Sequence, residues 1–110
     1  MEKINYSHLV MKILTTHFEQ LQKSGNTRSQ LIIDAERHHY LLMTVGWNEQ
    51  RREYGSLIHI DIQNDKIWIQ NDGTEVGIAK ELVEAGVPQA NIVLGYKSPF
   101  KRQFTDYALC

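Results

Sequence analysis

Two polar side chains that can do chemistry, His59 and Asp61, stand two residues apart in the chain. They fall in a run that alternates apolar and polar residues, so both should point to the same face of a β-strand. Such a pair can act as a general acid–base dyad or supply two metal ligands. A metal site needs at least one more ligand, and the nearby sequence spacing supplies none. We interpret the pair as part of a polar face, or as a His–Asp hydrogen bond where the sheet meets a partner.

The remaining histidines are weaker candidates. His38 and His39 are adjacent, so on a strand their side chains point to opposite faces and do not easily ligate one ion. His8 and His17 fall in a predicted helix and are more than one turn apart. The sequence therefore predicts no catalytic residues, no cofactor and no metal, with an enzyme that uses His59 and the nearby aspartate as the alternative.

Three other polar residues, Asp34, Glu36 and Lys66, invite comparison with a metal-dependent nuclease. A nuclease core of that type needs an Asp on one strand and an acidic-x-Lys triplet on the next, so that two carboxylates converge on Mg²⁺. The candidate second strand carries Asp61 but has Gln63 where the Lys would stand. The sequence argues against a nuclease, and it contains no nucleophile elbow, phosphate loop or zinc-ligand spacing.

Basic and aromatic residues gather at two places in the sequence, and both are candidate contact surfaces. Such side chains grip nucleic acid and stack on bases, and they also dominate protein interfaces. A formal net charge of −1 favours the protein interface, with direct DNA binding as the alternative. The residues proposed for partner or DNA contact are Trp47, Arg51, Arg52, His59, Asp61, Trp68, Tyr96, Lys97, Lys101 and Arg102.

Length and composition place these residues in one domain, residues 1–110, of ordinary globular character: 42% of the residues are apolar and 23% are charged. The lone cysteine, Cys110, excludes a disulfide within the chain. The N-terminal segment has neither a signal-peptide pattern nor a membrane span, so we expect a cytoplasmic protein.

The elements that position the candidate residues follow from hydrophobic periodicity. Apolar residues at three- and four-residue spacing predict a helix over 4–23, ended near Gly25. Short β-type runs follow at 30–35 and 39–47, and residues 48–52 are predicted to form a charged connection. A second helix is expected after residues 71–74, where Asp72 or Thr74 can cap it and Glu75 completes a capping box. It should end at Gly86.

A hairpin over residues 53–70 is the clearest element, with Asn64-Asp65 as its turn. Counting outward from that turn pairs Asp61 with Trp68 and His59 with Gln70. The isoleucines then share one face of the hairpin. Trp68 lies on the other, outer face, which is expected to bind another protein if no part of the chain covers it.

The last predicted elements are a short edge strand or buried extended segment at 92–94 and a short helix from Ser98-Pro99 to about Phe104. The order predicts an α+β fold, an antiparallel sheet of three to four or more strands with the N-terminal and second helices on one face. An apolar outer face favours a homodimer.

From Tyr40 onward the sequence contains an ordered series of short segments: Val45-Gly46-Trp47, Arg52 with Tyr54-Gly55, Ile58-His59-Ile60-Asp61-Ile62, Lys66-Ile67-Trp68-Ile69-Gln70, Asp72-Gly73-Thr74-Glu75, Gly86-Val87-Pro88 and Ile92-Val93-Leu94-Gly95. In these segments the sequence resembles the XisI family, the fdxN-element excision controlling factors of cyanobacteria. The resemblance implies a non-enzymatic accessory role in programmed DNA rearrangement. It also implies a protein partner of the XisH type, with DNA reached through the complex.

Overall fold

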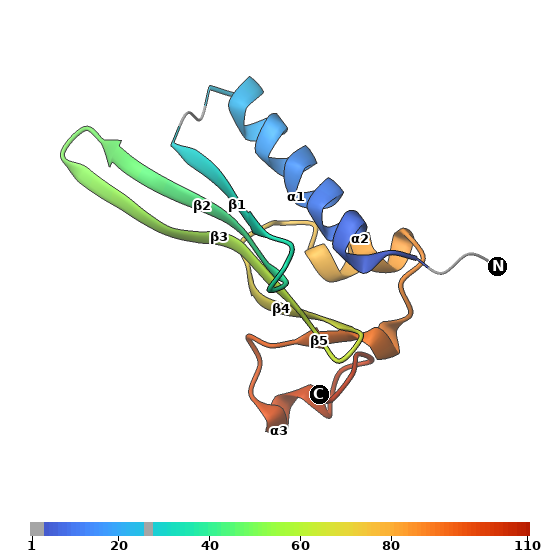
Figure 1. Ribbon diagram of the computed structural model, residues 1–110. Coiled ribbons are helices and arrows are strands. Elements are labelled where there is room, and N and C mark those ends of the chain that lie inside the picture. Colours follow the sequence, from blue (N-terminus) through green and yellow to red (C-terminus); the bar gives the residue numbers. More distant parts are fainter. Residues whose placement is uncertain (1–3, 26–27) are drawn as a thin grey trace.

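The computed structural model describes residues 4–25 and 28–110, which form a five-stranded sheet with two longer helices on one face (Figure 1). The strands lie side by side in chain order, and the predicted α+β class is confirmed. The elements are α1 (Tyr6–Lys23), β1 (Ser29–Asp34), β2 (His39–Asn48), β3 (Arg51–Gln63), β4 (Lys66–Asp72), α2 (Ile78–Glu84), the 3₁₀ turn η1 (Gln89–Asn91), β5 (Ile92–Leu94) and α3 (Pro99–Arg102).

The fifth strand corrects the expectation of a purely antiparallel sheet. Strands β1 to β4 are antiparallel neighbours, but β5 runs parallel to β4. Between these two strands the chain passes through α2, which returns it to the same end of the sheet, as a parallel pair requires. All three residues of β5 are buried, as expected for a strand covered on both faces.

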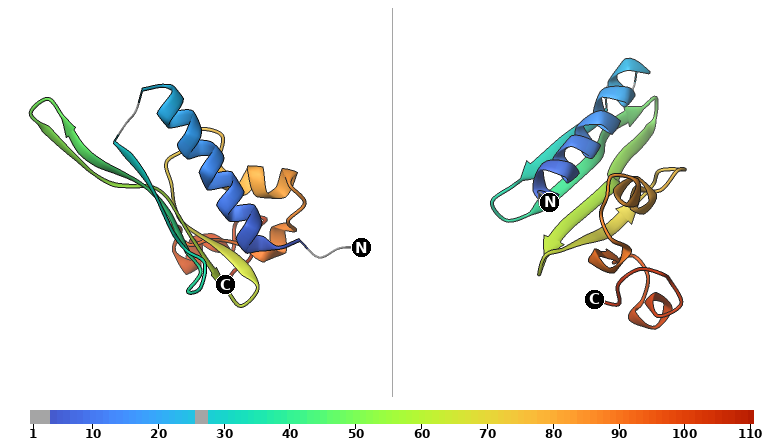
Figure 2. Two further views of the ribbon diagram at one scale, coloured as in Figure 1. Left: turned by 45° about the horizontal axis from the view of Figure 1, so that its top comes forward. Right: turned by 90° about the vertical axis from the view of Figure 1, so that its right-hand side faces the viewer.

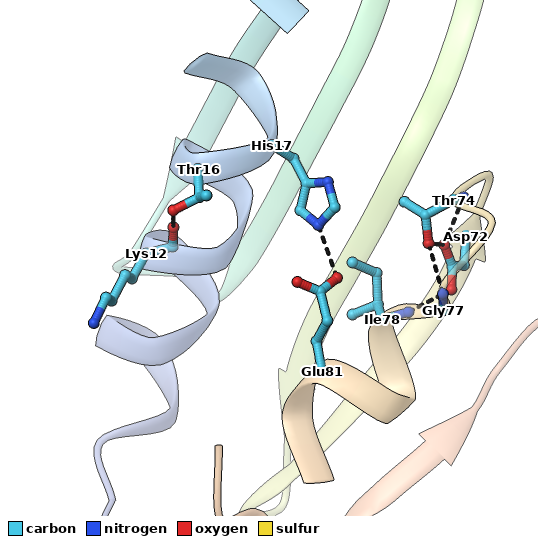
Figure 3. A network of polar contacts seen from close by, with 8 residues as sticks. All are labelled: Lys12, Thr16, His17, Asp72, Thr74, Gly77, Ile78 and Glu81. Carbon is cyan, nitrogen blue, oxygen red and sulfur yellow. Dashed lines mark hydrogen bonds and ion pairs between the residues drawn. The ribbon is translucent and has the colours of Figure 1, made fainter. Parts of the chain in front are cut away.

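The core lies between the sheet and the helices α1 and α2. Helix α1 contacts β1, β2 and β3, whereas α2 contacts β4 (Figure 2). Val10 and Leu14 of α1 are fully buried against isoleucines of the sheet. His17 and Glu81 connect the two helices through a hydrogen bond of 2.8 Å (Figure 3). Within the residues described, no helix combines the length and apolar character needed to cross a membrane.

The predicted β3–β4 hairpin is confirmed around its turn and wrong at its far end. The pairs Asp61–Trp68 and Ile60–Ile69 form as counted from Asn64-Asp65, whose residues both have positive φ. A β-bulge then intervenes, so His59 lies opposite Asn71. Gln70 becomes the extra residue on its strand.

A long β2–β3 hairpin replaces the charged connection predicted for residues 48–52. Glu49 and Gln50 form the turn, and Glu49 has a φ of 58°. Arg51 and Arg52 belong to β3, where they pair with Asn48 and Trp47. Figure 1 shows this end of the hairpin projecting beyond the other strands.

Helix α2 is capped from the preceding loop, although it begins later than the sequence indicates. Asp72 Oδ2 accepts the backbone N–H of Ile78 at 2.7 Å, and Thr74 Oγ1 accepts that of Gly77 at 3.1 Å (Figure 3). Because the helix starts at Ile78, Glu75 precedes it and the predicted capping box is wrong. The predicted end at Gly86 is confirmed by its φ of 104°.

The C-terminal tail packs along the edge strand. Ser98 caps α3 as predicted, accepting the backbone N–H of Lys101, and the helix ends at Arg102, two residues before Phe104. Further on, Ala108 forms a parallel bridge with Val93 of β5. The tail therefore covers backbone groups that an edge strand would otherwise expose. Cys110 is exposed at its end.

Candidate functional site

Two histidines and one aspartate meet on the outer face of the sheet, opposite the helices. His59 and Asp61 lie two residues apart on β3, as predicted. His39 of β2 joins them because it is the direct cross-strand partner of Asp61. We call these three residues the His–Asp triad. One nitrogen or oxygen atom from each lies within 4.8 Å of the other two.

The Asp61 carboxylate is the centre of the triad. Its Oδ1 accepts hydrogen bonds from His39 Nδ1 at 2.8 Å and from His59 Nε2 at 3.0 Å. Its Oδ2 accepts one from Gln70 Nε2 at 3.3 Å. Asp61 is only 7% exposed, so an ionised carboxylate there depends on these donors. Because an ionised carboxylate only accepts, His39 presents its N–H at Nδ1 and His59 at Nε2.

The triad contains the kinds of donor atom that exchange protons or hold a metal ion. Imidazole nitrogens and a carboxylate oxygen suit several first-row transition metals, and a His–Asp pair can relay a proton. The side chains of His39 and His59 are 50% and 32% exposed. Solvent therefore reaches the triad from the outer face, while the Asp61 carboxylate sits beneath the two rings.

His39 was not among the predicted site residues, and a β-bulge explains why. Counting outward from the Glu49–Gln50 turn pairs His39 with Ile60, which would turn its side chain toward the helices. The register shifts after Met43–Ser56, so that Leu42 pairs with Ile58 and Leu57 is the extra residue. That single insertion places His39 opposite Asp61.

The bulge is stabilised by residues distant in sequence. Asn71 Nδ2 donates to the Ser56 carbonyl at 2.6 Å, and the Gly73 N–H donates to the Leu57 carbonyl at 2.8 Å. A side chain at position 73 would be crowded, since a Cβ on Gly73 would lie 2.8 Å from the Leu57 side chain. The place of His39 beside Asp61 therefore depends on contacts between residues distant in sequence, and local spacing does not predict it.

Two of the predicted contact residues, Trp47 and Arg52, lie close to Tyr54 at the projecting end of the β2–β3 hairpin. The Arg52 guanidinium lies 5.5 Å from the ring centre of Trp47, its cross-strand partner, and 5.7 Å from that of Tyr54. Trp47 and Tyr54 are 60% and 70% exposed. We call Trp47, Arg52 and Tyr54 the aromatic arm. Arg51 is also exposed on this hairpin, beside the turn.

The second group of predicted contact residues lies in the C-terminal segment, apart from the aromatic arm (Figure 1). Lys101 is exposed and Lys97 is half-buried beside the Tyr96 ring. Burial raises the pKa of the Tyr96 hydroxyl, and the charge of Asp72 adds to the effect. Because the C-terminal segment lies apart from the projecting end of the hairpin, the basic residues of these two places do not form one continuous patch.

Arg102 stabilises the fold of the C-terminal segment through contacts of its side chain. Its guanidinium donates to the carbonyls of Leu94 and Gly95 and lies 5.2 Å from the ring centre of Trp68. Trp68 does face away from the isoleucines, as predicted, but it is half-buried beneath this side chain. The exposed part of the outer face therefore lies toward β2 and the aromatic arm.

A hollow of about 590 Å³ opens beside the start of α1, lined by residues outside the triad. Two of its lining residues, Ser7 and His38, bond to the buried Tyr40 hydroxyl at 2.6 Å and 3.1 Å. These bonds connect the β1–β2 turn to α1. His38 thus bonds on the helix side while His39 bonds to Asp61, so the two histidines do not share a site, as predicted; His38 lies in the turn before β2, with a φ of 63°, and is not a strand residue.

Known proteins of the same fold are similar to this chain over nearly its whole length. The sequence profile of the family described as XisI protein matches residues 1–109. A crystal structure of a XisI-like protein from Anabaena variabilis has a TM-score of 0.89 and 45% sequence identity, covering 96% of both chains. The fdxN element excision controlling factor XisI from the same organism has a TM-score of 0.85 and 35% identity, again covering 96% of both chains. No functionally curated protein matches the sequence.

Proposed function

The chain belongs to the XisI family, and from this premise we propose that it is a non-enzymatic accessory factor that controls excision of a DNA element. The relative named as an fdxN element excision controlling factor supports excision control as the biological role. We propose further that the protein acts in a cyanobacterial cytoplasm through a protein partner of the XisH type, and that it reaches DNA through this complex.

The observation that carries the proposed partner binding is the aromatic arm. Tyr, Trp and Arg are the side chains that supply most of the energy of protein interfaces. Here the Arg52 guanidinium lies 5.5 Å from the ring centre of Trp47 and 5.7 Å from that of Tyr54, so the three side chains form one exposed group that a partner can contact. The arm projects from the fold, where a partner can reach both sides of the hairpin (Figure 2).

Direct recognition of DNA by this chain alone is less well supported. The formal net charge is −1, and sequence-independent DNA affinity comes from neutralising many phosphates. The exposed basic residues are divided between the arm and the C-terminal segment, and Arg102 is engaged by backbone carbonyls. A partner that supplies the positive surface fits these features better.

A non-enzymatic role is supported by the surroundings of the triad. Among the described residues, its hydrogen-bond partners are its own members and Gln70. No serine, cysteine or lysine side chain in that set is hydrogen-bonded to His39 or His59, as an activated nucleophile would be.

Co-purification tests the proposal. The protein is co-expressed with a XisH-type protein, and the lysate is treated with nuclease so that DNA cannot bridge the two. We expect the partner to be retained by the wild type and by Val76→Ala, which changes an exposed apolar residue in the β4–α2 loop. Trp47→Ala should retain much less. Failure of the wild type to retain the partner at micromolar concentration would contradict the proposal.

A further inference from the structure

We propose that the His–Asp triad is a binding site for a divalent first-row transition metal ion of the zinc type, with His39 Nδ1, His59 Nε2 and Asp61 Oδ1 as ligands. This inference is independent of the proposed partner and of excision control. It rests on the identity, spacing and support of the three donor atoms.

The donor atoms already converge on one point. Both imidazole nitrogens are directed at Asp61 Oδ1, at 2.8 Å and 3.0 Å. Metal–nitrogen and metal–oxygen bonds of about 2.0–2.2 Å in a tetrahedral site place neighbouring ligand atoms roughly 3.3 Å apart. The two nitrogen–oxygen distances therefore have to lengthen by only a few tenths of an ångström, and the two imidazole nitrogens, which lie within 4.8 Å of each other, have to reach the same spacing. Each neutral ring would move its proton to its other, outward nitrogen.

The scaffold holds the ligands on rigid elements. His59 and Asp61 come from one strand, and His39 from the strand paired with it in register. All three backbones are fixed by the sheet ladder, a more precise support than a loop provides. The Leu57 bulge places His39 opposite Asp61, since an uninterrupted register would pair it with Ile60.

The Asp61 carboxylate accepts a hydrogen bond from a neighbouring side chain, as metal-binding carboxylates usually do. Gln70 Nε2 donates to Asp61 Oδ2, which orients the carboxylate and leaves Oδ1 for the ion. Asp61 is buried, whereas the two rings are partly exposed. An ion bound here would be reached from solvent, with a coordination position left for water.

Direct metal titration tests the proposal. Tag-free protein with Cys110→Ser, which removes the thiol as a competing ligand, is stripped of metal and titrated with Co²⁺ under visible absorption. Zn²⁺ is then used to displace the cobalt, and calorimetry gives the stoichiometry. We expect one ion per chain, Co²⁺ absorption bands typical of low coordination number, and a melting temperature that rises when Zn²⁺ is added.

The variants separate this site from adventitious binding. His39→Ala or His59→Gln should weaken binding by more than about 100-fold, and Gln70→Ala, which removes only the outer support, by roughly 10–100-fold. His8→Ala removes an exposed histidine from α1 and should bind like the parent. Circular dichroism without metal shows whether each variant folds. No binding by folded parent protein, or unchanged binding by folded His39→Ala and His59→Gln, would overturn the site.

Discussion

Asp61 is buried and Asp72 is half-buried, and the hydrogen-bond donors around these two strand carboxylates assign them different roles. Asp61 is bonded mainly by two partly exposed histidine rings, which can reorient and exchange a proton for a cation. Asp72 is bonded by local groups: its Oδ1 accepts from Thr74, and its Oδ2 accepts the backbone N–H of Ile78. The first is a ligand by its chemistry, and the second is a helix cap.

Replacing Asp72 with alanine should destabilise the fold through α2. The first backbone N–H of that helix loses its acceptor, which typically costs about 0.5–2 kcal/mol in the free energy of unfolding. Urea denaturation followed by circular dichroism measures the difference. Glu75→Ala is the matched control, because Glu75 is exposed and precedes the helix; it should change the stability by less than about 0.5 kcal/mol. Equal losses in the two variants would show that Asp72 is not the cap.

At the scale of elements, local rules predicted the hairpin near its turn but failed at the bulges. Asn64-Asp65 sets the first pairs, as two-residue turns do, and alternation places the isoleucines toward the helices. The bulge at Leu57 depends on hydrogen bonds from Asn71 and Gly73, which only the folded sheet brings close. The third triad member, His39, could therefore not be predicted from spacing.

The parallel direction of β5 escaped prediction for a related reason, although a strand or extended segment was expected at residues 92–94. A run of three apolar residues has too little length to reveal its direction. Its direction follows from the path of α2 over the sheet, and its burial from the tail that covers Val93 and Trp68. The short helix α3, by contrast, was predictable because Ser98 and Pro99 are a local start signal.

The tail should loosen when Arg102 is replaced with alanine. Its charge-assisted bonds to the Leu94 and Gly95 carbonyls are lost, at a cost of about 1–3 kcal/mol in unfolding free energy. In a Trp47→Phe background, the emission of Trp68 should shift to longer wavelength as the ring becomes solvated. Lys101→Ala removes an exposed cation from the same helix and should leave emission and stability unchanged. An unshifted spectrum for Arg102→Ala would mean that Trp68 is covered by something else.

For the whole molecule, the two faces of the sheet differ in how they are covered. The inner face packs against α1 and α2, whereas the outer face is covered over β4 and β5 by the tail (Figure 1). Over β1 to β3 the outer face carries the exposed Ile32, the triad and the aromatic arm. We therefore expect contact with another protein to fall on this side of the molecule.

A homodimer remains a prediction at this scale. We expect sedimentation equilibrium at micromolar concentration to give twice the chain mass, because a second copy would cover apolar groups on the outer face. Ile32→Lys, a change at an exposed position, should produce a folded monomer. A wild-type protein that stays monomeric across this concentration range would contradict the prediction.

The affinity of the purified protein for its XisH-type partner tests the central claim most directly. Calorimetric titration compares the wild type with Trp47→Ala, Arg52→Ala and the exposed control Val76→Ala. The account predicts tight binding by the wild type and the control. It predicts a loss of about 2 kcal/mol or more, roughly 30-fold in Kd, for each arm variant. Wild-type affinity in both arm variants, or no binding by any folded form, would contradict it.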